Sequence, residues 1–181
     1  MLDCVDWTTE DWEKVLFTDE TILEINSRTG RVHVQRPVGE AFNPKYLAPK
    51  IAHPEKLNAW ACFSAKGPGR IHVFDDNLNA SGLNKILQRH VVDAALKMWP
   101  NEQWYYQQDN NPKHRAHIVH KFFHNSGVMV LDHPPYSPDL NPIENLWEII
   151  RTRVDDRKPK DLVQLKQFWE EEWDKTTDEE R

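Results

Sequence analysis

The stretch EKVLFTDETILEI (residues 13–25) combines β-branched and aromatic residues with partial polar alternation, which is typical of a β-strand. It is followed by the turn-forming cluster NSRTG (26–30) and by RVHVQ (31–35), whose alternation predicts an antiparallel partner strand. Residues 36–56 are rich in Pro, Lys and Glu without periodicity, and we expect an exposed loop there.

Further along the chain, LNAWACFS (57–64) and RIHVF (70–74) flank the breaker KGPG, which predicts a hairpin. From Ser81 to Met98 the apolar spacing changes to that of a helix. The remaining pattern predicts, in order, a strand at 104–108, a helix at 114–124, a strand at 128–131 and helices at 142–154 and 161–174.

A strand meander followed by alternating helices and strands requires parallel crossover connections in the second half of the chain. We therefore expect an α/β fold, with a mixed five-stranded sheet and helices on both faces. This is the layout of the ribonuclease-H-like fold.

Composition limits the class of protein. The 181 residues suffice for one well-buried domain and are too few to expect two. No apolar run approaches the length of a membrane span and the N-terminus lacks signal-peptide features, so we expect an intracellular protein with no membrane partner. Cys4 and Cys62 cannot make a disulfide framework, and neither lies in a CxxC pair that would indicate zinc.

The net charge of -6 argues against a free-standing nucleic-acid binder, because phosphate neutralisation normally requires excess Lys and Arg. However, residues 155–181 hold ten acidic against six basic side chains, which accounts for four of the six excess charges. Basic contacts can therefore still be local to a site elsewhere in the chain.

Three carboxylates stand out, although each has a simpler explanation. Asp19 occupies a predicted strand, where Asp is disfavoured, and an outward-facing polar position would account for it. Asp109 directly follows the strand WYYQQ, and DNNP is also good turn chemistry. Glu144 lies in NPIE, where Asn141 as N-cap, Pro142 at N1 and Glu144 at N3 would form a capping box; taken alone, capping is the better interpretation.

The combination favours function, because strand one, the end of strand four and the start of a later helix meet at one edge of this topology. Three close carboxylates repel one another and raise each other's pKa unless a cation is bound. Oxygen-only ligands select Mg²⁺ or Mn²⁺, and two such ions about 4 Å apart support phosphodiester cleavage. This chemistry needs no organic cofactor.

The same segments carry a family resemblance. VLFTDET, QQDNNPKH and PPYSPDLNPIENLW resemble the three catalytic blocks of Tc1/mariner-type transposases, and the 34 residues between Asp109 and Glu144 match the spacing of the Tc1 branch. The resemblance extends from DWTTEDWEKVLF through WACFS to EEW near the end.

This resemblance implies a DDE-type transposase with endonuclease and strand-transfer activity. Asp19, Asp109 and Glu144 would be catalytic and bind two Mg²⁺ or Mn²⁺ ions, with Asn110 and His114 lining the site. Water would cleave the transposon ends, and the freed 3′-hydroxyl would attack target DNA, at TA dinucleotides in Tc1-like elements. DNA is the expected partner and the nucleus the expected location, while a homodimer stays an open alternative.

The chain departs from the family pattern at both ends. The family begins with two helix-turn-helix modules and continues beyond TTDEER, so we expect residues 1–181 to be a single catalytic domain without DNA-binding modules and with a truncated C-terminus. A catalytically idle, transposase-derived protein that associates with DNA or another protein is the alternative. An unrelated nuclease of the same fold is disfavoured by DLNPIENLW.

Two further clusters have open interpretations. A histidine stripe is predicted on the helix at 114–124, facing away from the core, with solvent or DNA contact favoured over zinc; its members are His114, His117, His120 and His124. A basic cluster after Glu144 is a candidate DNA-backbone patch, formed by Arg151, Arg153, Arg157, Lys158 and Lys160. Basic residues at 28, 31, 36, 45, 50 and 56 could contact phosphates or another subunit, although a solvated loop explains them equally well.

Overall fold

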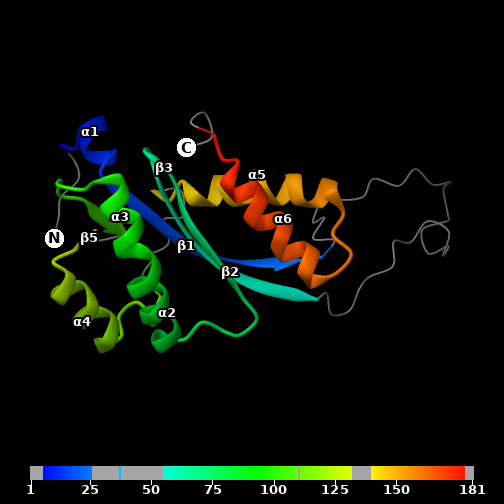
Figure 1. Ribbon diagram of the computed structural model, residues 1–181, viewed down its shortest axis with the longest axis horizontal. Coiled ribbons are helices and arrows are strands. Elements are labelled where there is room, and N and C mark those ends of the chain that lie inside the picture. The colour runs from blue at the N-terminus through cyan, green and yellow to red at the C-terminus, as the bar shows by residue number, and fades with distance from the viewer. Residues whose placement is uncertain (1–5, 26–36, 38–54, 110, 132–139, 178–181) are drawn as a thin grey trace.

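The chain is built around one five-stranded sheet, seen in the computed structural model of Figure 1. The structure describes residues 6–25, 37, 55–109, 111–131 and 140–177. The strands lie in the order β3-β2-β1-β4-β5. Their bounds are β1 (Val15–Glu24), β2 (Lys56–Ser64), β3 (Gly67–Phe74), β4 (Tyr105–Gln107) and β5 (Met129–Val130).

The sheet is mixed, as predicted. β1, β2 and β3 form an antiparallel meander, whereas β1–β4 and β4–β5 are parallel pairs. The predicted partner strand at 31–35 lies outside the described residues, and so does most of the predicted loop at 36–56. β1 is thus the central strand of the sheet, with an antiparallel neighbour on one side and a parallel one on the other.

The helices agree with most of the predicted ones. They are α1 (Thr9–Trp12), α2 (Ala80–Ile86), α3 (Val92–Met98), α4 (His117–Ser126), α5 (Ile143–Arg157) and α6 (Leu162–Asp174). The predicted helix at 81–98 corresponds to α2 and α3, joined by the π-helical turn η2 (Leu87–Val91). None of the described helices is long and apolar enough to cross a bilayer.

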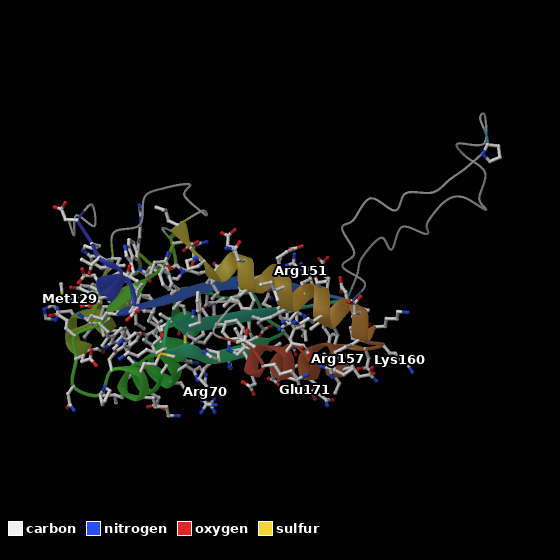
Figure 2. The ribbon with its side chains drawn as sticks, turned by 90° about the horizontal axis from the view of Figure 1, so that it is seen from above. Arg70, Met129, Arg151, Arg157, Lys160 and Glu171 are labelled. Atoms are coloured by element: carbon white, nitrogen blue, oxygen red, sulfur yellow. The ribbon has the colours of Figure 1, made fainter. Side chains whose placement is uncertain are left out.

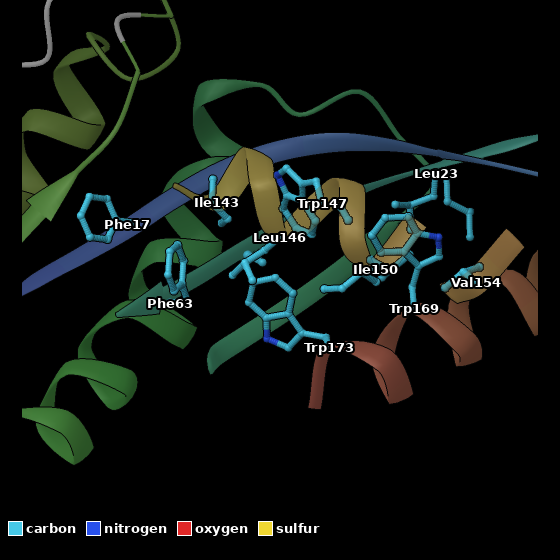
Figure 3. Packing of buried hydrophobic residues seen from close by; sticks show 14 of the residues in the cluster. Phe17, Leu23, Phe63, Ile143, Leu146, Trp147, Ile150, Val154, Trp169 and Trp173 are labelled. Atoms are coloured by element: carbon cyan, nitrogen blue, oxygen red, sulfur yellow. The ribbon is translucent and has the colours of Figure 1, made fainter. Parts of the chain in front are cut away.

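Strand alternation builds one core between the sheet and the pair α5 and α6. Successive side chains of β1 point to opposite faces, so Phe17 and Leu23 join this core. Trp147 of α5 packs against both α6 tryptophans, which are labelled in Figure 3. Its ring centroid is 5.9 Å from that of Trp169 and 5.2 Å from that of Trp173. Three large aromatic side chains therefore fix α5 and α6 against the same face of the sheet.

A second core covers the opposite face. Leu16 of β1 and Trp60 of β2 pack there against α2, η2, α3 and α4, together with Leu87 and Phe123. Both faces of the sheet are consequently covered by helices, as predicted, and Figure 1 shows the two helical layers on opposite sides.

The predicted helix at 114–124 was wrong at its start. Residues 111–116 form successive turns, in which the backbone N–H groups of residues 114–116 bind the carbonyls three residues earlier, and extended Ala116 (ψ 142°) separates these turns from α4. His114 is therefore not on the exposed stripe but only 3% exposed, whereas the other three histidines are exposed.

Candidate active site

The pairing register brings Asp19 and Asp109 to the same level of the sheet. β1 and β4 are parallel and pair Val15 with Tyr105 and Phe17 with Gln107, a constant offset of 90 residues. Continuing this offset by two residues sets Asp19 opposite Asp109, just past the end of β4. Adjacent strands are about 4.8 Å apart, so the two carboxylates are close neighbours.

The Thr18 side chain holds the two strands together where the ladder ends. Its hydroxyl lies 2.8 Å from the carbonyl oxygen of Gln107, to which it donates, and 3.0 Å from the hydroxyl of Tyr106. All three residues are buried. The separation of Asp19 and Asp109 is thus set by side-chain hydrogen bonds immediately before each of them.

Asp19 is an unusual carboxylate, because its environment disfavours the charged form. Burial raises the pKa of Asp19 to about 7, and the neighbouring charges of Glu20 and Asp109 act in the same direction. The indole Nε1 of Trp147 donates a hydrogen bond to Asp19 Oδ2 at 3.3 Å, which partly offsets these effects. A bound cation would relieve the repulsion.

The start of α5 is attached directly to β1. Asn141 is 6% exposed, and its amide nitrogen donates to the Thr18 carbonyl at 3.2 Å. Glu144 lies in the first turn of α5, three residues before Trp147, and its side chain is exposed. The third candidate carboxylate therefore belongs to a helix end that is anchored next to Asp19.

The predicted capping box at this helix was wrong. α5 begins at Ile143 with Pro142 at its N-cap, and Pro142 has no capping side chain. The Asn141 amide nitrogen donates to β1, and its oxygen accepts a long hydrogen bond of 3.5 Å from the backbone nitrogen of Ile143, so the helix start is held by Asn141 without a capping box. Capping therefore does not account for Glu144.

His114 connects the Asp109 loop to β1. Its Nδ1 lies 2.8 Å from Gln108 Oε1, while its Nε2 lies 3.2 Å from Asp109 Oδ1 and 3.5 Å from Glu20 Oε1. The sequence resemblance implied a site-lining role for His114, and this buried position beside Asp109 is compatible with it. Asn110, the other residue implied, lies outside the described residues.

Glu20 is a buried acid that the sequence analysis missed. Its side chain is 16% exposed and lies 3.0 Å from Lys113 Nζ. Burial acts to raise the pKa of Glu20, but the nearby polar groups of His114 and Lys113 outweigh burial and lower it overall. Two consecutive acidic residues in a strand were the available signal.

The site offers the right atoms for a hard divalent cation but is not closed around one. Asp19 and Asp109 supply carboxylate oxygens at one level of the sheet, and the raised pKa of Asp19 marks a place where positive charge is needed. Within the described ranges, no three His, Cys, Asp or Glu side chains are gathered closely enough to hold an ion. Glu144 would have to approach the pair for a complete site.

The structure divides the predicted basic cluster. Arg151 lies on α5 near β1, with Nη2 3.4 Å from Thr21 Oγ1. Arg157 instead ties α5 to α6 through ion pairs with Glu171 and Glu172, and its guanidinium lies 3.7 Å from the centre of the Phe168 ring. Lys158 and Lys160 are exposed and follow the last turn of α5, about 20 Å along the helix from Glu144. Lys160 is labelled there in Figure 2.

A pocket of about 590 Å³ lies along the part of β1 that follows Asp19, where β4 has ended. Lys113 and Arg151 supply positive charge on its walls. Glu20, Ile22 and Phe74 also line it, whereas Asp19, Asp109 and Glu144 do not.

A mixed sheet with helices on both faces and carboxylates at the edge of its central parallel strands defines the ribonuclease-H-like class of fold. Residues 14–166 match the family model described as DDE superfamily endonuclease, and the chain belongs to this family. The match covers both strands and the helix that position Asp19, Asp109 and Glu144.

Among curated proteins, the chain is similar to the transposable element Tc1 transposase of Caenorhabditis elegans, at 31% identity over 153 residues. It is also 30% identical to the Tcb2 transposase of Caenorhabditis briggsae over the same length. Each match covers 82% of this chain and 54% of the relative, so the chain spans about half the length of these proteins.

Solved structures of the Mos1 mariner transposase share the fold. A Mos1 paired end complex with Mn superposes with a TM-score of 0.77 at 18% identity, covering 95% of this chain and 51% of that chain. The catalytic domain of Mos1 mariner transposase gives a TM-score of 0.69 at 18% identity, covering 95% of this chain and 75% of that domain. A further Mos1 paired end complex was solved with Mg. These likenesses confirm the ribonuclease-H-like fold predicted from the sequence.

Proposed function

We propose that this chain is the catalytic part of a Tc1-like transposase, which cleaves DNA phosphodiester bonds at transposon ends and transfers the freed ends into target DNA. The observation that carries this proposal is the common level of Asp19 and Asp109 on adjacent parallel strands, with the start of α5 attached beside them. Membership of the DDE superfamily endonuclease family and the similarity to the Tc1 transposase support it.

Asp19, Asp109 and Glu144 would hold two Mg²⁺ or Mn²⁺ ions. When bound, such ions supply charge neutralisation for the attacking and leaving oxygens. Two neighbouring side chains position the aspartates, since Trp147 orients one oxygen of Asp19 and His114 orients one oxygen of Asp109. The Mn and Mg of the Mos1 complexes support this choice of ions.

The proposed reaction has two steps. In the first, a water oxygen bonds to the phosphorus at the transposon end and loses a proton, while the bond from phosphorus to the 3′-oxygen breaks and that oxygen gains a proton. In the second, this 3′-hydroxyl loses its proton and bonds to a target phosphorus, while the bond from that phosphorus to its own 3′-oxygen breaks and the released oxygen gains a proton. The number of phosphodiester bonds is unchanged in the second step, so it needs no energy-rich cofactor.

DNA is the proposed partner, as transposon end and as target. The similarity of the fold to a Mos1 strand transfer complex supports this choice. The pocket along β1 next to Glu20 and Thr21, with Lys113 and Arg151 on its walls, also supports it. A homodimer and a nuclear location belong to the same proposal, because transposition joins two ends of one element to chromosomal DNA.

The test is strand transfer by this chain on DNA with a pre-cleaved 3′-hydroxyl end, in Mn²⁺ or Mg²⁺. We expect metal-dependent joining that is lost in Glu144→Gln, since that change removes one carboxylate of the proposed site. Glu148→Gln, which alters an exposed glutamate one turn further along α5, is the matched control and should join normally.

Two other outcomes would change the interpretation. Joining that persists in Glu144→Gln would remove Glu144 from the site. A folded wild-type chain that binds divalent metal with carboxylate-dependent affinity but joins nothing would instead favour the idle, transposase-derived protein.

A further inference from the structure

Glu20 and Asp19 are neighbours in β1, but they serve opposite faces of the sheet. Asp19 contacts Trp147 of α5, whereas Glu20 contacts Lys113 and His114 on the other side. A glutamate that is 16% exposed in a central strand is costly unless its charge is paired. Both of its partners belong to the turns that follow Asp109.

Asp109 itself is weakly fixed by the sheet. Pairing of β4 with β1 ends at Gln107, and the Asp109 side chain is 46% exposed. Its Oδ1 accepts a hydrogen bond from the backbone nitrogen of Asn111 at 3.1 Å and lies 3.2 Å from His114 Nε2. His114 is the contact that links this loop carboxylate to another element.

The His114 ring lies between Asp109 and Glu20. Its Nε2 is 3.2 Å from Oδ1 of Asp109 and 3.5 Å from Oε1 of Glu20, and its Nδ1 is 2.8 Å from Oε1 of Gln108, the residue before Asp109. Within the described part of the chain, Nε2 and Oε1 of Glu20 are buried and neither has a hydrogen bond of good geometry, so the ring is held there by close contact. Glu20 therefore limits where the ring can lie beside Asp109.

We propose that Glu20 is a positioning residue, which acts through His114 to hold Asp109 opposite Asp19. The role rests on the proposed function, because it assumes that Asp109 binds the catalytic metal. Lys113 completes the arrangement by pairing with the second oxygen of Glu20, so two consecutive residues of the Asp109 loop are attached to β1. Outer partners of this kind usually contribute about 10–100-fold to metal affinity or activity.

The experiment measures Mn²⁺ affinity by calorimetry for wild type, Glu20→Gln, His114→Asn and the double variant. We expect each single variant to bind Mn²⁺ about 10–100-fold more weakly, and the double variant to lose no more than the weaker-binding single variant, because the two residues act in one path. Glu24→Gln removes the same charge from the same face of β1 and should change affinity less than about twofold, as expected of separated charges in salt.

The results separate this role from general charge effects and from unfolding. The proposal would be overturned if Glu20→Gln bound Mn²⁺ as tightly as wild type. It would also be overturned if the fold-loss of Mn²⁺ affinity in the double variant equalled the product of the two single fold-losses. Thermal unfolding in chelator identifies variants that fail to fold; for these, Glu20→Gln combined with Lys113→Met removes both charges of the ion pair and should still weaken Mn²⁺ binding.

A metal-independent measurement distinguishes this inference from the proposed function. In ¹H–¹⁵N NMR spectra of the metal-free chain, we expect the backbone amide signals of Asn111 and His114, which make the hydrogen bonds of the Asp109 loop, to shift in Glu20→Gln and to stay unchanged in Glu24→Gln. If wild type binds no Mn²⁺ but shows this pattern, the proposed function fails and the positioning contact stands. Amide signals of Asn111 and His114 that are insensitive to Glu20→Gln overturn the inference.

Discussion

The Asp19 carboxylate is unfavourable in the metal-free protein, since burial and two acidic neighbours raise its pKa to about 7. The folded-state pKa is above the ordinary value of 3.8, so the stabilising contribution of the protonated acid is fully present below about pH 4 and is lost as pH rises through 7. The metal-free chain should therefore become less stable, through this group, between pH 4 and pH 8.

We predict that Asp19→Asn raises the melting temperature in chelator at pH 8 and changes it little at pH 4. Asparagine keeps an oxygen that can accept from Trp147 but carries no charge to bury. The rise in the pKa of Asp19 from 3.8 to about 7 corresponds to a few kcal/mol of folding free energy, at about 1.4 kcal/mol for each pKa unit. Calorimetry at both pH values checks this, with the exposed Asp75→Asn as control; an equal shift at pH 4 and pH 8 would contradict it.

At the level of single residues, the sequence identified Asp19 and Asp109 because both are conspicuous locally. Glu20 was overlooked because its significance depends on Lys113 and His114, which lie more than 90 positions away. The prediction that His114 lies exposed on a helix was wrong for a related reason. Residues 111–116 form turns, so α4 begins only after His114. Tertiary partners of this kind leave no periodic signal.

Among the elements, the start of α5 shows how local preference yields to tertiary contact. The helix was predicted at 142–154 and lies at Ile143–Arg157, so its existence was foreseeable. The arrangement of its first turn was not, because the Asn141 side chain donates to β1 while its oxygen accepts only a long hydrogen bond from Ile143. This hydrogen bond from Asn141 to Thr18 attaches the start of α5, which carries Glu144, to the strand that carries Asp19.

We predict that Asn141→Ala lowers the free energy of unfolding by about 1–3 kcal/mol, because the Thr18 carbonyl loses a buried partner. It should also reduce strand joining in the folded protein by displacing Glu144. Chemical denaturation and the joining assay provide the two measurements. Asn145→Ala, an exposed change in the same turn, should affect neither, and equal effects of both changes would refute the anchoring role.

The joint between α5 and α6 gives a second prediction at this scale. Arg157→Ala should lower the melting temperature by about 2–4 °C, since it removes ion pairs with α6 and a contact with the Phe168 ring. Lys158→Ala should leave stability unchanged, and any effect of it should appear in DNA affinity. If Arg157→Ala weakens DNA binding but leaves the melting temperature unchanged, Arg157 belongs to the DNA-binding patch and not to the joint between α5 and α6.

The whole molecule is a sheet shared by two apolar cores. Its mixed topology and its two helical layers were predictable, because alternation within β1 and helical spacing elsewhere are properties of the sequence itself. The 90-residue offset between β1 and β4 was not, because parallel register is set by packing between distant segments. That offset is what brings Asp19 and Asp109 together.

Because both cores bury the same strands, we predict that damage to either weakens the entire fold. Leu146→Ala beside α6 and Leu87→Ala on the opposite face should each cost about 2–5 kcal/mol. Far-ultraviolet circular dichroism and tryptophan fluorescence should then report one common transition. Separate transitions for the two signals would mean that the layers unfold independently.

The central claim is that Asp19, Asp109 and Glu144 form one metal site, and anomalous diffraction from crystals soaked in Mn²⁺ tests it most directly. We predict anomalous density between Asp19 and Asp109, with Glu144 drawn toward it and no density in Asp109→Asn crystals. Absence of density there, or density only at the histidines of α4, would contradict the claim.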